Sequence, residues 1–231
     1  MIILGVDSSS RSAGAAVIKD GVLLGECFSN SGLTHSRTLL PLITDCLKAS
    51  EISVKDIDYI AVSVGPGSFT GVRIGISAVK DIAFTDNIRC IPVSTLEALA
   101  VNVKHFTGII CSVLDARCNQ FYSGIFKSDG EKITRVFPDE ALSFEELKEK
   151  LSSFSDRIIL VGDGAALLYS QLEGFFDNIL LSDISLRYPR ASSVSLCSEG
   201  KNSISPEELV PVYLRLPQAQ RNLLKKEENK E

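Results

Sequence analysis

The stretch GPGSFTGVRIG, residues 65–75, decides the fold, because it joins a predicted buried strand over 58–65 to a predicted helix over 68–84. Glycines permit backbone conformations and close approaches that other residues do not, and free N–H groups at a helix start can hold an anion. The stretch lacks the lysine of a Walker A loop, and Gly71 stands one place beyond the third glycine of a dinucleotide fingerprint. A phosphate-binding loop and a purely structural turn therefore both remain open.

The helix predicted over 68–84 has a wide apolar surface. Its polar residues Arg73, Ser77, Lys80 and Asp81 form one narrow stripe, whereas a helix that covers one face of a sheet needs an apolar stripe of only about 100°. Within the helix predicted over 36–49, residues 39–47 are likewise apolar over most of a turn. The two helices favour a protein–protein interface, with burial on two sides as the alternative.

The N-terminus carries a second motif, GVDSSS at residues 5–10. Apolar runs at residues 2–7, 14–19 and 22–28, separated by tight connections, predict an antiparallel meander whose first turn holds this motif. Backbone and hydroxyl donors in such a turn can bind phosphate oxygens, with the aspartate near a metal-bound water. A polar β-turn without a ligand explains the same residues equally well.

The order of predicted elements repeats along the chain. After a strand at 89–93 and a helix at 95–102, we expect strands near 109–115, 120–127 and 131–137, a helix near 143–151, a strand at 157–162 and helices at 164–173 and 191–199. Asp7 and Asp115, which are 108 residues apart, each end the first strand of a half. The pattern predicts an α/β protein of two duplicated βββαβα lobes around a cleft, with coincidence between two generic α/β stretches as the alternative. The expected division is residues 1–104, residues 105–217 and a mobile charged tail over 218–231.

Catalytic constellations are scarce. The two histidines, His35 and His105, cannot form a metal site by themselves, and HExxH and GxSxG motifs are missing. In the second half, Ala116 and the bulky Arg117 follow Asp115, where a phosphate-binding hairpin needs glycine. We therefore expect a degraded or repurposed cleft, with no catalytic residue and no metal.

Composition limits the partners and the compartment. The 231 residues include 24 basic and 29 acidic side chains, for a net charge of −5. Autonomous nucleic-acid binding normally shows the reverse balance, because neutralisation of phosphates supplies most of that affinity. No signal peptide and no apolar stretch of about 20 residues is evident, and six scattered cysteines suggest reduced thiols. We expect a soluble cytoplasmic protein without membrane contact.

Five motifs together resemble the bacterial TsaB family, also called YeaZ, whose members take part in making N6-threonylcarbamoyladenosine in tRNA. They are GVDSSS at 5–10, THSRTLLPLI at 34–43, GPGSFTGVRIG at 65–75, LDAR at 114–117 and PVYLRLPQA at 211–219. The resemblance implies an actin/Hsp70-like (ASKHA) fold of two RNase H-like lobes, without catalytic activity. It also implies a heterodimer with the related catalytic protein TsaD, a homodimer when alone, association with the ATPase TsaE, and tRNA reached indirectly through that complex.

The resemblance also assigns roles to residues. Helices 36–48 and 68–84 would bind TsaD, with an expected interface of Leu39, Leu40, Ile43, Leu47, Phe69, Gly71, Val72, Gly75, Ile76 and Val79. A degenerate nucleotide cleft would comprise Asp7, Ser8, Ser9, Ser10, Gly65, Pro66, Gly67 and Asp115. Arg73, Lys80 and Arg117 are candidate contacts to tRNA or a partner. No cofactor is expected on this chain alone; ATP would be used by partner subunits, and a nucleotide could lie at the complex interface. The alternative function is an ASKHA-type ATPase or small-molecule phosphotransferase that uses the same cleft.

Overall fold

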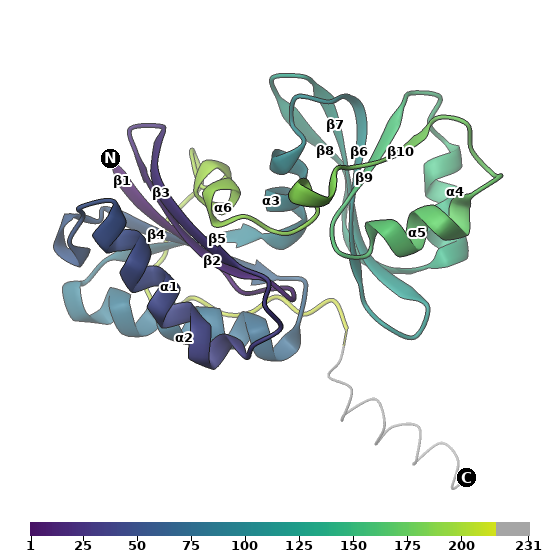
Figure 1. Cartoon of the computed structure of the whole chain (residues 1–231). Coiled ribbons are helices and arrows are strands. Elements are labelled where there is room, and N and C mark those ends of the chain that lie inside the picture. Colours follow the sequence, from purple (N-terminus) through teal and green to yellow (C-terminus); the bar gives the residue numbers. More distant parts are fainter. Residues whose placement is uncertain (216–231) are drawn as a thin grey trace, which may run out of the picture.

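A computed structural model describes residues 1–215 as two sheets with helices around and between them (Figure 1). The first sheet has the strand order β3-β2-β1-β4-β5. Its strands are β1 (Ile2–Asp7), β2 (Ala13–Lys19), β3 (Val22–Ser29), β4 (Tyr59–Gly65) and β5 (Arg89–Ser94). The second sheet has the order β8-β7-β6-β9-β10. Its strands are β6 (Thr107–Asp115), β7 (Gln120–Asp129), β8 (Ile133–Ser143), β9 (Ile158–Val161) and β10 (Ile179–Leu181).

The two sheets share one topology. In each, three antiparallel strands are followed by two strands parallel to the first. The predicted duplication of βββαβα lobes is therefore confirmed. The sequence analysis missed β10 and the last residues of β8, because a three-residue strand has no measurable alternation.

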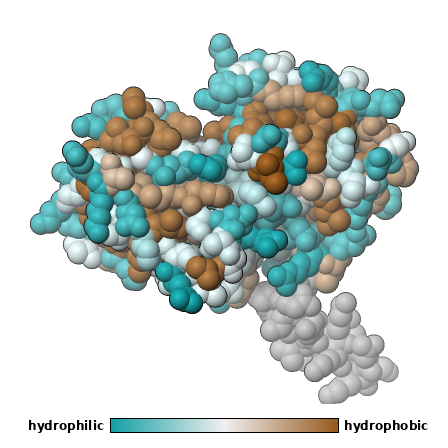
Figure 2. Space-filling view, viewed as in Figure 1, coloured by the Kyte–Doolittle hydropathy of each residue, from teal (hydrophilic) through white to brown (hydrophobic). Residues whose placement is uncertain are grey.

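Helices connect and cover the strands. They are α1 (His35–Ala49), η1 (Val54–Asp56), α2 (Phe69–Asp86), α3 (Thr95–Asn102), α4 (Phe144–Ser152), α5 (Ala165–Leu172), η2 (Ile184–Leu186) and α6 (Ala191–Cys197). The bounds of α1 and α2 lie within about two residues of those predicted. On the face seen in Figure 2, apolar side chains gather on each lobe, while the surface between the lobes is largely hydrophilic.

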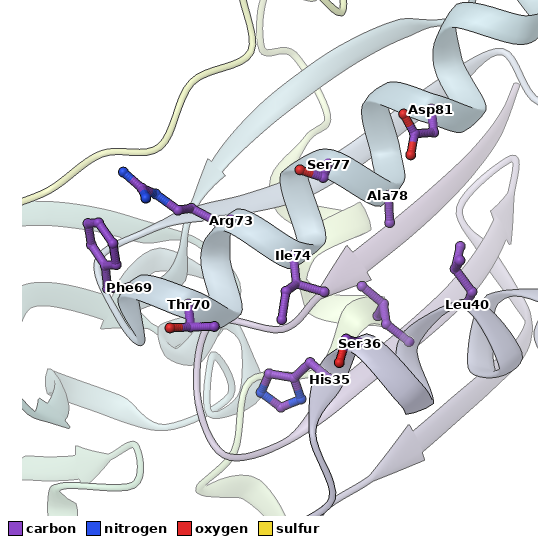
Figure 3. Close-up of a pocket in the computed structure, with 11 residues that line it drawn as sticks. His35, Ser36, Leu40, Phe69, Thr70, Arg73, Ile74, Ser77, Ala78 and Asp81 are labelled. Atoms are coloured by element: carbon purple, nitrogen blue, oxygen red, sulfur yellow. The ribbon is translucent and has the colours of Figure 1, made fainter.

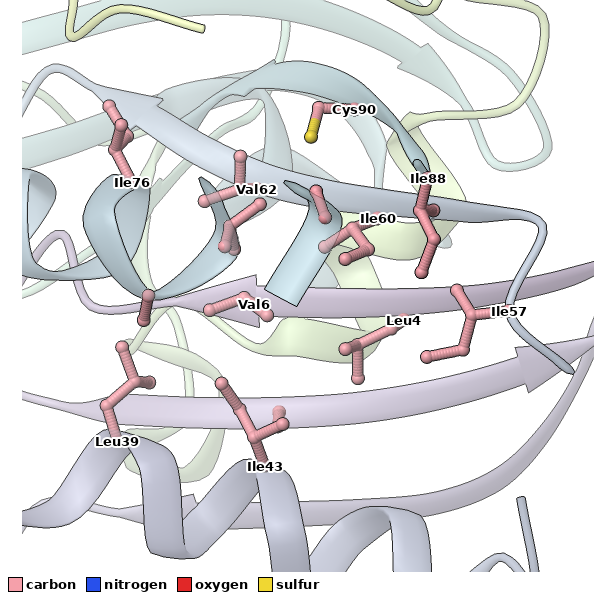
Figure 4. Packing of buried hydrophobic residues seen from close by; sticks show 14 of the residues in the cluster. Leu4, Val6, Leu39, Ile43, Ile57, Ile60, Val62, Ile76, Ile88 and Cys90 are labelled. Atoms are coloured by element: carbon pink, nitrogen blue, oxygen red, sulfur yellow. The ribbon is translucent and has the colours of Figure 1, made fainter. Parts of the chain in front are cut away.

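The largest core lies between the first sheet and the helices α1 and α2. Leu4 and Val6 of β1 alternate with residues of the opposite face, as a strand requires, and they pack with Leu39 of α1 and Ile76 of α2 (Figure 4). The second sheet packs in the same way against α4 and α5, through residues such as Leu147 and Leu168.

The helices α3 and α6 lie between the two sheets and contact each other (Figure 1). Leu99 of α3, which follows the first sheet in the chain, packs with Ile110 and Phe126 of the second sheet. Val194 of α6, which follows the second sheet, packs with Ile3 of the first. Each half of the chain thus supplies the helix that covers the inner face of the other half's sheet. The expected division between residues 104 and 105 separates the strands of the two sheets. The helix α6 belongs to the second range by sequence, but it packs against the first sheet.

After α6, the chain returns across the first lobe. In this C-terminal segment (residues 198–215), Ile204 bridges to Cys90 of β5, and Leu209 is buried in the core beneath α2. The Val212 N–H donates to the carbonyl of Val64 at 2.7 Å, and Arg215 reaches the second lobe by donating to the Ala116 carbonyl at 2.8 Å. The predicted tail over 218–231, and the last two residues of the expected second range, lie outside the described residues.

Candidate functional site

The glycines of the 65–75 stretch hold the start of α2 against the turn between β1 and β2. A Cβ atom on Gly67 would lie 2.1 Å from the Ser9 carbonyl oxygen, and one on Gly71 would lie 2.2 Å from that of Ser8. The Ser68 N–H donates to the Ser9 carbonyl at 2.7 Å. The Gly71 N–H donates to the Ser68 hydroxyl at 3.2 Å. Both of these N–H groups at the start of α2 therefore already have hydrogen-bond acceptors within the chain. The stretch acts here as a packing turn.

Asp7 lies at the end of β1 and is only 1% exposed. Its carboxylate accepts hydrogen bonds from the Ser9 hydroxyl at 2.8 Å and the Ser9 N–H at 3.2 Å. Burial raises the pKa of Asp7, and hydrogen bonds from neighbouring serines oppose that effect. The Ser8 hydroxyl donates to the Gly71 carbonyl at 2.9 Å, and the Ser10 and Ser12 hydroxyls bond each other at 3.0 Å. All three serine hydroxyls of the motif are therefore engaged within the chain.

The corresponding turn of the second lobe is built differently. Arg117, Cys118 and Asn119 all have positive φ, between 54° and 60°, a region that non-glycine residues rarely adopt. The Asp115 carboxylate accepts the Arg117 N–H at 2.7 Å, which stabilises the turn. The Asp115 N–H in turn donates to Asp163 at 3.2 Å.

Asp163 is a cleft residue that the sequence analysis did not name. Burial is the main cause that raises the pKa of its carboxyl to about 6, and the negative charge of Asp115 adds to that effect, whereas Arg11 opposes it. Its signal in the sequence was Gly162-Asp163-Gly164. An acidic residue between two glycines at the end of a buried strand was the available clue.

The structure corrects the equivalence of Asp7 and Asp115. Asp7 lies on the face of β1 opposite to Leu4 and Val6. It shares its face with Ile3, which packs toward α6. Asp115 shares its face with Cys111 and Val113, which pack toward α4 and α5. The offset of 108 therefore pairs residues on non-equivalent faces, because a register error of one residue moves a side chain to the other face of a strand.

No metal centre is assembled within residues 1–215, where no three histidine, cysteine or acidic side chains gather in a metal-binding arrangement. His35 is hydrogen-bonded within the chain, with its Nε2 2.8 Å from the Ser10 carbonyl oxygen. His105 lies at a separate surface turn, where its Nδ1 is 3.3 Å from the Gly130 carbonyl oxygen. Across the same residues, every helix is too short or too polar to span a membrane.

The residues predicted as a partner interface divide into two groups. Leu40 is exposed and Phe69 is half-buried. The other eight side chains or glycines face the chain's own core: Leu39, Ile43, Leu47, Gly71, Val72, Gly75, Ile76 and Val79. The apolar surface of α2 is buried against α1, the first sheet and the turn at Ser8. These eight residues are buried in this structure, and their contact with a partner stays a prediction.

A groove of about 440 Å³ runs between α1 and α2 (Figure 3). Apolar side chains form most of it, with charged Arg73 and Asp81 along the α2 side. Its lining comprises His35, Ser36, Leu39, Leu40, Phe69, Thr70, Arg73, Ile74, Ser77, Ala78 and Asp81. Of the residues predicted as a partner interface, Leu39, Leu40 and Phe69 line this groove.

The three predicted charged contacts lie in different surroundings. Arg73 donates from Nε to the Tyr213 hydroxyl at 2.7 Å, and Lys80 donates to the Glu207 carbonyl at 3.2 Å. Arg117 is exposed on the turn of the second lobe. Arg73 and Lys80 thus contact the C-terminal segment, whereas Arg117 lies on an exposed turn against which Arg215 packs.

Two duplicated RNase H-like lobes define an α/β protein of the ASKHA type. A family model described as "TsaD: tRNA N6-adenosine threonylcarbamoyltransferase" matches residues 30–220. The chain is 31% identical to the "tRNA threonylcarbamoyladenosine biosynthesis protein TsaB" of Escherichia coli, over 93% of this chain and 95% of that protein. It is 29% identical to the protein of that name from Bacillus subtilis, over 95% and 96% of the two chains. The solved structure of YeaZ from Pseudomonas aeruginosa superposes with a TM-score of 0.78 at 25% identity, over 92% of this chain and 99% of that one. The chain belongs to the TsaB family, also called YeaZ.

Proposed function

We propose that this protein takes part in forming N6-threonylcarbamoyladenosine in tRNAs that read ANN codons, as a non-catalytic subunit that binds and stabilises a TsaD-type threonylcarbamoyltransferase. The names of its relatives support the pathway, and the matching family model supports kinship with the transferase. We further propose that it works in the cytoplasm, that TsaE joins the complex, and that the chain forms a homodimer when alone.

The observation that carries the non-catalytic role is the use of polar groups in the first turn. Ser8, Ser9 and Ser10 direct their hydroxyls to the Gly71 carbonyl, to Asp7 and to Ser12. A phosphate in this turn would have to displace these bonds, and an unpaired buried polar group costs about 1–3 kcal/mol. We therefore propose that this chain binds no cofactor by itself, that ATP is used by partner subunits, and that any nucleotide lies at the complex interface.

The groove between α1 and α2 is the surface we propose for the transferase. An amphipathic helix can lay its apolar face into such a groove, anchored at helical spacing. Leu40 is 52% exposed at the groove, and Arg73 and Asp81 offer one charge of each sign beside it. Since the partner belongs to the same fold family, we propose that its equivalent helices contribute that face.

Co-purification tests this proposal with substitutions that leave the core intact. Leu40→Glu combined with Ser77→Glu places two charges in the groove at exposed positions. We expect the transferase to be lost from the complex, because two carboxylates would have to lose water against an apolar partner face. Ile184→Glu, at a residue 66% exposed in the second lobe, is the matched control. Substitution of Val72 or Ile76 would be uninformative, since both are core residues. Co-elution of the double variant at the wild-type ratio would exclude this interface.

The pathway itself is tested by depletion of the protein followed by mass spectrometry of threonylcarbamoyladenosine in tRNA. We expect the modified nucleoside to fall sharply, and an unchanged level would refute the proposed pathway. The alternative, an ASKHA-type ATPase or phosphotransferase, predicts tight binding and turnover of ATP with Mg²⁺ by the isolated chain. Isothermal calorimetry distinguishes it, because we expect no binding there.

A further inference from the structure

The C-terminal segment extends the surface of the groove beyond α2. Phe69 and Arg73 project from α2 on the side away from His35 and Leu40 of α1 (Figure 3). There they meet Tyr213 of the C-terminal segment, whose ring stacks on that of Phe69 with centroids 4.8 Å apart. Tyr213 keeps 40% of its surface exposed. The outer rim of the groove is therefore built by two parts of the chain that lie 140 residues apart.

Tyr213 fixes the guanidinium group of Arg73. The Arg73 Nε donates to the Tyr213 hydroxyl at 2.7 Å, and the guanidinium carbon lies 3.9 Å from the centre of the Phe69 ring. A cation over an aromatic face is attracted to it, so two contacts hold this side chain. A guanidinium group has five N–H donors. Within residues 1–215, the four donors on Nη1 and Nη2 of Arg73 make no hydrogen bond.

Tyr213 is itself held on both sides within the chain. The Val212 N–H donates to the Val64 carbonyl of the first lobe at 2.7 Å. Two residues after Tyr213, Arg215 donates to the Ala116 carbonyl of the second lobe at 2.8 Å. The position of Tyr213, and through it the direction of the Arg73 side chain, is therefore set by the chain's own contacts.

The charge of Arg73 has no carboxylate partner in the part of the chain that the structure describes. Arg135 and Arg190 each form an ion pair with an acidic side chain, whereas Arg73 forms none. Asp81 lies further along the same helix by just over two turns, about 12 Å along its axis. The terminal N–H groups of a guanidinium match the two oxygens of a carboxylate. Because the Arg73 side chain is already ordered, it would lose less conformational entropy when it binds one.

We propose that Tyr213 is a positioning residue, which holds Arg73 so that its terminal N–H groups bind an acidic side chain on the partner's docking helix. This inference rests on the proposed function, because the partner is the transferase proposed for the groove. The docking surface then includes the C-terminal segment as well as α1 and α2. Leu40 supplies apolar contact, and Arg73 selects the partner, since a helix without a carboxylate at that place would leave the guanidinium group unpaired.

Isothermal calorimetry of the full chain with the transferase, in the absence of RNA, tests the contact. Tyr213→Phe keeps the ring but removes the hydrogen bond to Arg73, and we expect the dissociation constant to rise by about threefold to tenfold. Tyr169→Phe is the matched control, because Tyr169 is also 40% exposed but lies in the second lobe, and it should remain within about twofold of wild type. Arg73→Glu should bind more weakly than Arg73→Ala, because it opposes the partner's carboxylate with a like charge.

A double-mutant cycle separates positioning from a merely structural role. In an Arg73→Ala background, Tyr213→Phe should change the dissociation constant by less than about twofold, because no guanidinium group remains to be held. An equal loss in both backgrounds, or wild-type affinity of Tyr213→Phe, would overturn the positioning role. Wild-type affinity of Arg73→Glu would overturn the carboxylate contact and assign Arg73 to another ligand, such as RNA.

Nitrogen-15 NMR of the chain alone separates this inference from the proposed function. We expect an Arg73 Nε–H signal that is protected from exchange in wild type and in Tyr169→Phe, and that is lost in Tyr213→Phe. Arg73→Lys assigns the signal. If the wild-type chain forms no complex with the transferase, the proposed function fails, together with the contact to the partner's carboxylate. A signal that depends on Tyr213 then still supports the positioning role, and its absence from wild type overturns that role.

Discussion

At the scale of single residues, Asp163 shows how position changes the chemistry of a side chain. Its neighbours Gly162 and Gly164 permit close packing, since a Cβ atom on Gly162 would lie 2.0 Å from the Val113 carbonyl oxygen. That packing buries the carboxyl beside Asp115, and burial raises its pKa to about 6. The ionised form of Asp163 is therefore less favourable in the folded protein than in the unfolded chain.

This environment predicts a pH-dependent effect of Asp163→Asn. A carboxyl whose folded pKa lies near 6, above its ordinary 3.8, contributes stability below about pH 4 that is lost as the pH rises toward 6. Relative to wild type, the asparagine variant should therefore gain about 1–3 kcal/mol in free energy of unfolding at pH 7 compared with pH 4. Urea denaturation at both pH values measures this difference. Asp45→Asn, at an exposed position on α1, is the control, and an equal response of both variants would contradict the prediction.

At the scale of elements, the C-terminal segment is part of the first lobe. Leu209 is 1% exposed and belongs to the core formed by the first sheet, α1 and α2. Gly65, with φ of +118°, lets the Val212 carbonyl approach β4, because a Cβ atom there would lie 2.4 Å from that oxygen. The chain around Val212 is thus held along the strand that carries the glycine motif.

Substitution within this segment should separate buried from exposed positions. Leu209→Ala removes a core side chain and should lower the free energy of unfolding by about 2–5 kcal/mol, because it leaves a cavity. Val210→Ala, next in the chain but 61% exposed, should change it by less than about 0.5 kcal/mol. Chemical denaturation measures both variants. A loss at Val210 as large as that at Leu209 would show that the segment does not pack as described.

At the scale of the whole molecule, the two lobes are joined by an exchange of helices. Burial of Val194 and Cys197 of α6 against Ile3 and Ile91 covers the inner face of the first sheet. The start of α6 is held there by Glu26 of β3, which pairs with Arg190 at 2.8 Å and accepts the Ser192 N–H at 3.1 Å. A fragment that ends before α6 leaves this apolar face in water, at a cost of about 25 cal/mol per Å².

We therefore expect the lobes to unfold together. Residues 1–104 expressed alone should show no cooperative thermal transition by circular dichroism, whereas the full chain should show one transition for both lobes. Addition of residues 105–231 in trans should restore cooperative folding of the fragment, because it returns α6 to the first sheet. A cooperative transition of residues 1–104 alone would contradict this expectation.

The sequence by itself determined the order of strands and helices, the duplication and the family, because these depend on local periodicity and on contiguous motifs such as residues 65–75. It also indicated that Asp7 and the Ser8–Ser10 turn lie beside that motif. Only the tertiary structure decided which faces are free. It buried Val72 and Ile76, left Leu40 exposed, separated Asp7 from Asp115 by strand face and brought Arg215 against the Ala116 carbonyl of the second lobe. The physical reason is that burial and charge proximity arise from packing between segments far apart in the chain, which local periodicity does not encode.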